Sequence, residues 1–149
     1  MRKIIVSNNF LSEVADVLRR GNSVKVKIDG ISMLPFIIGG KDLVEIVPLA
    51  DDEDLKMWCC PLFCWNGKYM VHRYIGKEGN DYLMLGDGNV SRIEKVKRED
   101  IIGVLRYIIH PDGSVQDCRD ENWLKKGMWW YRLRPLRRFI LPVLRRCIK

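Results

Sequence analysis

The sequence lacks any apolar run of the ~18 residues that a helix needs to cross a bilayer. The opening residues, MRKIIVSNNF, also lack the long apolar core of a secretory signal peptide. We therefore expect a protein that is neither exported by an evident signal nor integral to a membrane, and that resides in the cytoplasm. Low-complexity tracts and repeats are absent too. With 149 residues, 47% of them hydrophobic, the chain is long enough for one domain with a core.

Metal-ligand motifs are also missing. Cys59, Cys60 and Cys64 lie close together, but the spacing C-C-x3-C fits no standard zinc pattern, and no second Cys or His pair completes a tetrahedral set. In a reducing compartment all five cysteines should be free thiols, and these three read better as small apolar residues of a strand. The sequence implies no metal and no nucleotide cofactor.

Much of the chain shows the period-two alternation of β-strands. Val24, Val26 and Ile28 alternate with two lysines, as in a half-buried strand. Asn66-Gly67 and Gly79-Asn80 are hairpin turn signals, and HPDGS closes another hairpin. Further strands are predicted at residues 43–47, 62–65, 68–75, 81–85 and 101–109. We therefore expect residues 1–117 to form a mostly β domain, a small β-barrel or folded ribbon.

Two segments are predicted to be helical. Residues 9–20 carry apolar side chains at helical spacing and end at Gly21. Residues 118–149 form a basic, aromatic and amphipathic C-terminal segment, which Pro135 and Pro142 are expected to interrupt. Its apolar stripe is predicted to comprise Leu133, Leu136, Phe139, Ile140, Val143, Leu144, Cys147 and Ile148.

The charge of this C-terminal segment suggests a partner. Between Trp129 and Lys149 the chain has arginines and a lysine but no acid. We expect a separable anchor that contacts an anionic membrane surface from the cytoplasmic side. The alternative is a terminal helix that docks its apolar stripe on the β domain and leaves its arginines in water.

Ser32 stands where a strand ends, between Gly30 and Pro35, so it is either a turn residue or an accessible nucleophile. A nucleophilic serine needs a nearby base, and the chain has only two histidines. His110 lies in a turn signal, whereas His72 lies within a predicted strand. A lone histidine in a strand is commonly structural, and Asp87 in the GDGN turn can be explained by turn chemistry, so these residues alone leave the choice open.

Four segments in order, GISMLPFI, YMVHRYI, LGDGN and EDIIGVL, resemble the signal-peptidase and LexA-repressor clan of serine peptidases, and most closely its small stand-alone bacterial members. The resemblance covers about residues 24–107. It implies Ser32 as nucleophile, His72 as general base in a V-H-R motif, and Asp87 as the residue that orients the base. Members of this clan that use histidine rather than lysine as the base have a second acid soon after this aspartate. Since Arg92 and Ile93 occupy that region, we expect no counterpart.

The resemblance implies a signal-peptidase-like serine endopeptidase that acts on a peptide or precursor protein. Backbone N–H groups at Ser32 and Gly30 would hold the oxyanion, and Met33 would line the substrate pocket. The alternative is a non-catalytic module that uses the same fold to bind a peptide or a lipid surface. Nucleic acid is not an expected partner.

Overall fold

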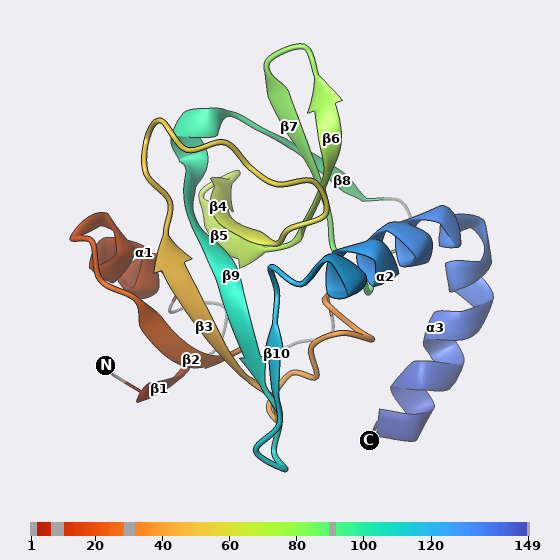
Figure 1. Cartoon of the computed structure of the whole chain (residues 1–149). Helices are drawn as coiled ribbons and strands as arrows, with labels where there is room; N and C mark the ends of the chain where they lie inside the picture. Colours follow the sequence, from red (N-terminus) through yellow and green to blue (C-terminus); the bar gives the residue numbers. More distant parts are fainter. Residues whose placement is uncertain (1–2, 7–10, 29–31, 90–91, 149) are drawn as a thin grey trace.

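The computed structural model describes residues 3–6, 11–28, 32–89 and 92–148 of the chain. More of its residues lie in strands than in helices, 35% against 28%. The strands form a curled half-barrel, with one helix near the N-terminus and two at the C-terminus (Figure 1). The expectation of a mostly β domain is confirmed at this level.

The larger sheet has the strand order β1-β2-β3-β9-β4-β5, and β10 pairs with β9. The first pair is parallel and the others are antiparallel. The long strand β9 connects the sheet because it pairs with β3, β4 and β10. The strands are β1 (Lys3–Val6), β2 (Val24–Ile28), β3 (Leu43–Pro48), β4 (Pro61–Trp65), β5 (Lys68–Val71), β9 (Ile101–Ile109) and β10 (Val115–Asp117).

The smaller sheet has the order β6-β7-β8, with bounds Arg73–Glu78, Asp81–Leu85 and Ile93–Val96. The single strand predicted at residues 68–75 is therefore wrong. The chain instead leaves the larger sheet at Val71 and enters the smaller one at Arg73, with His72 between them. His72 thus stands at the junction of the two sheets.

The predicted hairpin turns are confirmed. Asn66 and Gly67 both have positive φ, 49° and 76°, as a tight turn between β4 and β5 requires. Gly79 joins β6 to β7 with φ 62°. The HPDGS segment joins β9 to β10, and the His110 N–H donates to the Ser114 carbonyl at 2.9 Å.

The N-terminal helix α1 (Leu11–Arg19) packs its apolar face on the larger sheet. Val14, Ala15 and Leu18 are buried, while Ser12, Glu13, Asp16 and Arg19 face solvent. The three buried residues belong to a core that both sheets share. Its fully covered members include Val26, Val44, Ile46, Leu62, Phe63 and Met84.

The C-terminal helices are α2 (Glu121–Arg132) and α3 (Arg134–Ile148). The expected break at Pro135 is confirmed, because α2 ends just before it and α3 begins beside it. The break expected at Pro142 is wrong, because α3 continues through this residue. Among the described residues, no helix is long and apolar enough to cross a membrane.

The C-terminal segment is part of the folded domain, which the expectation of a separable anchor did not foresee. Trp123 and Leu124 of α2 are buried in the main core. Trp130 of α2 and Leu141 of α3 form a second buried cluster with Leu34. The docking alternative therefore holds for one face of these helices.

Candidate functional site

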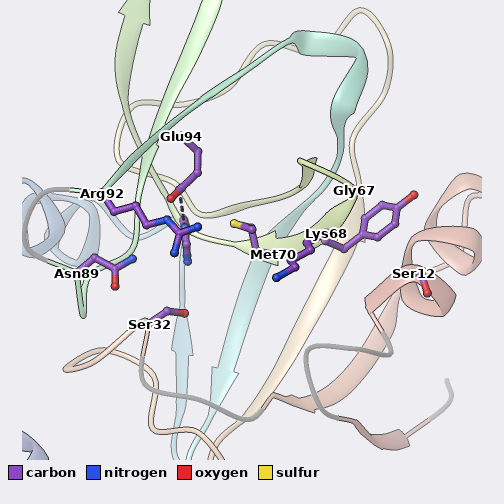
Figure 2. A pocket seen from close by; sticks show the side chains of 10 residues that line it. Ser12, Ser32, Gly67, Lys68, Met70, Asn89, Arg92 and Glu94 are labelled. Atoms are coloured by element: carbon purple, nitrogen blue, oxygen red, sulfur yellow. Dashed lines mark hydrogen bonds and ion pairs between the residues drawn. The ribbon is translucent and has the colours of Figure 1, made fainter.

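A cavity of about 520 Å³ opens between α1, β5 and the smaller sheet. Ser32, His72, Asn89 and Glu94 line it together with side chains of β5. Figure 2 shows that Ser12, on α1, stands at the far end of this cavity from Ser32. The structure therefore brings the predicted nucleophile and the predicted base to one cavity.

Ser32 begins a turn that leads toward Pro35. This turn is closed by the backbone N–H groups of Phe36 and Ile37, which both donate to the Met33 carbonyl at 3.0 Å. The Ser32 carbonyl accepts a hydrogen bond from the Gly88 N–H at 2.7 Å. Ser32 is thereby attached to the Gly86–Asn89 turn, although the two lie far apart in the sequence.

Glu94 orients His72. One carboxylate oxygen, Oε1, lies 2.7 Å from His72 Nδ1, and the side chains are only 1% and 7% exposed. The Phe63 ring meets the imidazole edge-on, with 5.9 Å between ring centroids. Because an ionised carboxylate only accepts hydrogen bonds, we assign the hydrogen of the neutral imidazole to Nδ1, which leaves the lone pair on Nε2.

The expected contact between Asp87 and His72 is wrong, and so is the expectation that no second acid follows. Glu94 takes the position beside His72, one residue beyond the pair Arg92 and Ile93. No sequence signal identified it, because the two apolar residues of the segment IEKV, Ile93 and Val96, lie on opposite faces of the strand. In β8 the exposed residues alternate with buried ones, and Glu94 shares the buried face with Val96. An acid on the inward face of a strand needs a buried partner.

Asp87 instead binds Arg73. Its two oxygens accept from Arg73 Nε at 2.8 Å and Nη2 at 2.6 Å, and both side chains are fully buried. The guanidinium also donates to the Trp58 carbonyl at 2.7 Å. The Phe36 and Trp123 rings lie 4.8 and 4.6 Å from its central carbon. This fork-to-fork geometry, with both charged groups buried, makes a strong and directional ion pair.

Burial alone would make the charge of Arg73 unfavourable, but the neighbouring Asp87 outweighs it and raises the pKa of Arg73. Arg73 therefore stays a cation in the core, where its role is to hold Asp87. Arg73 does not line the cavity that Ser32 and His72 line.

The Gly86–Asn89 turn is held by the C-terminal helices. Each of its four carbonyls accepts from a side chain of α2 or α3. Trp130 Nε1 donates to Asp87 at 2.7 Å, Arg145 to Gly88 at 3.1 Å, and Arg137 to Asn89 at 2.7 Å and Gly86 at 3.4 Å. Burial lowers the pKa of Arg137 to about 10, so it remains charged at neutral pH. Helices α2 and α3 therefore hold the turn to which Ser32 is attached.

Because Gly86 has no side chain, Ser32, His72 and Asn89 can pack closely around it. A methyl group added there would lie 2.6 Å from the Ser32 carbonyl oxygen, 2.7 Å from Asn89 Nδ2 and 3.1 Å from His72 Cδ2. The three residues therefore meet around a position that holds no side chain. Within the described part of the chain, no hydrogen bond joins the Ser32 hydroxyl to His72. Such bonds are often longer without substrate.

Of the other predicted site residues, Gly30 lies outside the described residues. The prediction that Met33 lines the pocket is wrong. Met33 is buried in the main core, and Met70 is the methionine that lines the cavity. His110 lies outside the cavity and is held by Asp42, with Nδ1 3.0 Å from Oδ1.

The cysteines are free thiols in the structure. Burial raises the pKa of Cys59 and of Cys118 to about 12, and that of Cys60 well above its usual value. At neutral pH these three are protonated and are poor nucleophiles. No cluster of three His, Cys, Asp or Glu side chains suited to a metal occurs in the residues that the structure describes.

Replacing Gly127 by alanine should destabilise the protein. Alanine normally stabilises a helix interior by about 1 kcal/mol relative to glycine. In α2, however, the added methyl group would overlap the Arg73 guanidinium. We expect a net loss of about 1–3 kcal/mol in the free energy of unfolding, measured with urea. The exposed neighbour Lys126→Ala is the control, and equal stability of the two variants would contradict the close packing.

In comparisons with known proteins, no family model matches the chain, and no curated protein shows significant similarity to it.

Proposed function

We propose that the protein is a serine endopeptidase of signal-peptidase-like fold, in which Ser32 is the nucleophile and His72 the general base. The observation that carries this proposal is the arrangement at the cavity. Ser32 and a histidine whose Nδ1 is bound to a buried carboxylate line the same cavity. That arrangement has the chemistry of a nucleophile, a base and a residue that orients the base.

In the proposed reaction, the Ser32 hydroxyl attacks the peptide carbonyl while Nε2 of His72 takes its proton. The tetrahedral intermediate collapses when His72 gives that proton to the leaving amine, and the acyl group remains on Ser32. Water then attacks the ester, again with His72 as base, and releases the acid and free serine. Glu94, which is bonded to Nδ1, stabilises the imidazolium form of His72.

The developing oxyanion needs N–H donors. The Ser32 backbone N–H is the first candidate by family resemblance. The Asn89 side chain lines the same cavity and carries an amide that can donate. The Gly88 N–H is already used by the Ser32 carbonyl, so it is not a candidate.

An extended peptide suits this cavity better than a compact small molecule. Among the described strands, β5 has one partner, β4, so its other edge is unpaired. Lys68, Tyr69 and Met70 of this strand line the cavity. A peptide that pairs with the free edge of β5 would pass along the cavity toward Ser32.

A fluorophosphonate probe tests the proposal because it reacts with activated serines without a known substrate. We expect covalent labelling of Ser32, identified by mass spectrometry of the labelled peptide. Ser12, which lines the same cavity on the exposed surface of α1, provides a matched control. Ser12→Ala should label fully and Ser32→Ala not at all.

The second candidate is a peptide-binding module without catalysis. The observation in its favour is that no hydrogen bond joins Ser32 to His72 in the described chain. It predicts no labelling of folded protein at any serine, together with saturable binding of extended peptides. Labelling at Ser12 alone would also contradict the proposed nucleophile.

A further inference from the structure

The C-terminal helices present an apolar face to solvent. Trp129, at the end of α2, is 57% exposed, and Phe139 and Val143 of α3 are 63% and 60% exposed. Leu133 and Leu136 are also exposed. We call these five residues the outer face. They follow one another at steps of three or four residues, so those on α3 lie on one side of the helix.

The outer face takes no part in holding the helix to the domain. Leu141 and Arg137 carry out that task and are almost completely covered, with Ile140 and Leu144 packed beside them. The stripe predicted from the sequence therefore divides in two. Ile140 and Leu144 pack inward, while Leu133, Leu136, Phe139 and Val143 face water. So many large apolar side chains left together on one surface indicate an interaction site.

Arginines lie beside this face. Arg132 covers the Trp129 ring with its central carbon 5.0 Å from the centroid, and Arg138 covers Phe139 in the same way at 4.8 Å. Arg146 follows Val143 by three residues and is exposed. Within the described chain, none of these three arginines has a carboxylate at salt-bridge distance. Their charge is therefore available to an anionic partner.

We propose that the outer face docks on an anionic lipid surface. In this arrangement α3 lies in the plane of the membrane, with Trp129, Leu136, Phe139 and Val143 inserted among acyl chains at the interface. Arg132, Arg138 and Arg146 contact lipid phosphates. Aromatic rings covered by guanidinium groups suit this boundary, since each has an apolar body and a polar partner. This inference goes beyond the proposed reaction and does not depend on it.

Two other partners, a second copy of this chain and nucleic acid, fit the outer face less well. A second copy on the same face would bring the arginines of two outer faces together, and α3 has no acid in its described residues to pair with them. Nucleic acid would use the arginines but would leave Leu136 and Val143 without a partner. Of these three partners, the lipid interface is the one that accepts both the aliphatic side chains and the charges.

The experiment uses the full chain, because truncation would also remove Trp130, Arg137 and Arg145 from the Gly86–Asn89 turn. Binding is measured by sedimentation with vesicles of equal parts phosphatidylglycerol and phosphatidylcholine, and with phosphatidylcholine alone. We expect binding to the anionic vesicles that weakens as salt rises, and much weaker binding to the neutral ones.

Two double variants test the two parts of the surface. Phe139→Ser/Val143→Ser removes apolar area, and Arg138→Gln/Arg146→Gln removes charge. Each should reduce the partition coefficient roughly tenfold or more. Met57→Ser/Val115→Ser is the apolar control on other exposed residues, and Lys56→Gln/Lys97→Gln is the charge control. Both controls should bind like the parent.

Equal binding by all five proteins would overturn the proposal, as would no binding to anionic vesicles. Self-association detected by sedimentation velocity and lost in Phe139→Ser/Val143→Ser, without lipid binding, would show that a second copy is the occupant. Retention on double-stranded DNA without vesicle binding would likewise overturn the proposal in favour of nucleic acid. Circular dichroism confirms that each variant is folded, which we expect because the substituted side chains face solvent.

Discussion

Ser32→Ala should abolish peptide hydrolysis, and His72→Ala should reduce it by at least about 10⁴-fold. The serine variant removes the atom that would form the acyl-enzyme. The histidine variant removes the acceptor for the serine proton and the donor for the leaving amine. Turnover is measured on a fluorogenic peptide library. For His72→Ala, the second-order rate of fluorophosphonate labelling gives the same information without a known substrate.

The combination of these two changes distinguishes a catalytic unit from two independent effects. If Ser32 and His72 act together, the double variant should be no less active than Ser32→Ala alone, because the first loss already removes the mechanism. The free energy of unfolding of Ser32→Ala should stay close to that of the parent. An active Ser32→Ala protein would contradict the proposed nucleophile.

Glu94→Gln should slow labelling by a smaller factor than His72→Ala. The amide oxygen can still accept from Nδ1, so the ring keeps its orientation, but the negative charge that stabilises the imidazolium is lost. Because Glu94 is covered by the protein, urea unfolding is measured on the same sample. A slow labelling rate that tracks only a loss of folded protein would contradict an orienting role.

The strands were largely predictable because period-two patterns and turn residues are local signals. Residues 81–85 and 101–109 are strands with the predicted bounds. The short strands β1 and β8 lack such signals, since four residues seldom establish a period. These strands form because they pair with β2 and β7. Pairing between strands cannot be predicted from one sequence by local patterns.

The break at His72 shows the same limit at the site itself. The sequence YMVHRYI reads as one strand because it contains neither proline nor glycine. The chain nevertheless changes sheets there, since Val71 pairs with Leu62 and Arg73 pairs with Leu85. The resemblance implied that His72 is the general base, and the structure places this residue at the cavity that Ser32 lines. Only the pairing of β8 with β7 brings Glu94 to its Nδ1.

The role of Asp87 could not be predicted from the turn motif either. The motif places a carboxylate at the end of β7, but it does not say which neighbour that carboxylate meets. In the fold, His72 and Arg73 are consecutive residues whose side chains point in opposite directions. His72 faces Glu94 in the cavity, and Arg73 faces Asp87 in the core. The resemblance named Asp87 alone as the partner of the histidine, and Glu94 was not among the candidates.

Asp87→Ala should therefore act on stability, with a loss of about 3–5 kcal/mol in the free energy of unfolding. The substitution leaves the Arg73 guanidinium in the core with the Trp58 carbonyl as its remaining described acceptor. A buried charge without its counter-charge is one of the costliest changes in a protein interior. For a domain of ordinary stability this loss is a large fraction of the total.

A double-mutant cycle with Arg73→Met separates this ionic effect from simple loss of packing. Each single change leaves one buried charge without its partner, whereas Arg73→Met/Asp87→Ala removes both charges. The double variant should therefore be clearly more stable than the sum of the single losses predicts. Urea unfolding of the four proteins measures the coupling. Losses that simply add would contradict a direct pair.

The matched comparison is Asp87→Asn with Glu94→Gln, since each converts one buried carboxylate to an amide of the same shape. Asp87→Asn should lower stability more, because Arg73 loses its counter-ion, while the labelling rate of the protein that remains folded should change little. Glu94→Gln should do the reverse. If Asp87→Asn instead slows labelling with stability unchanged, then Asp87 acts on His72 during the reaction, as the family resemblance implied.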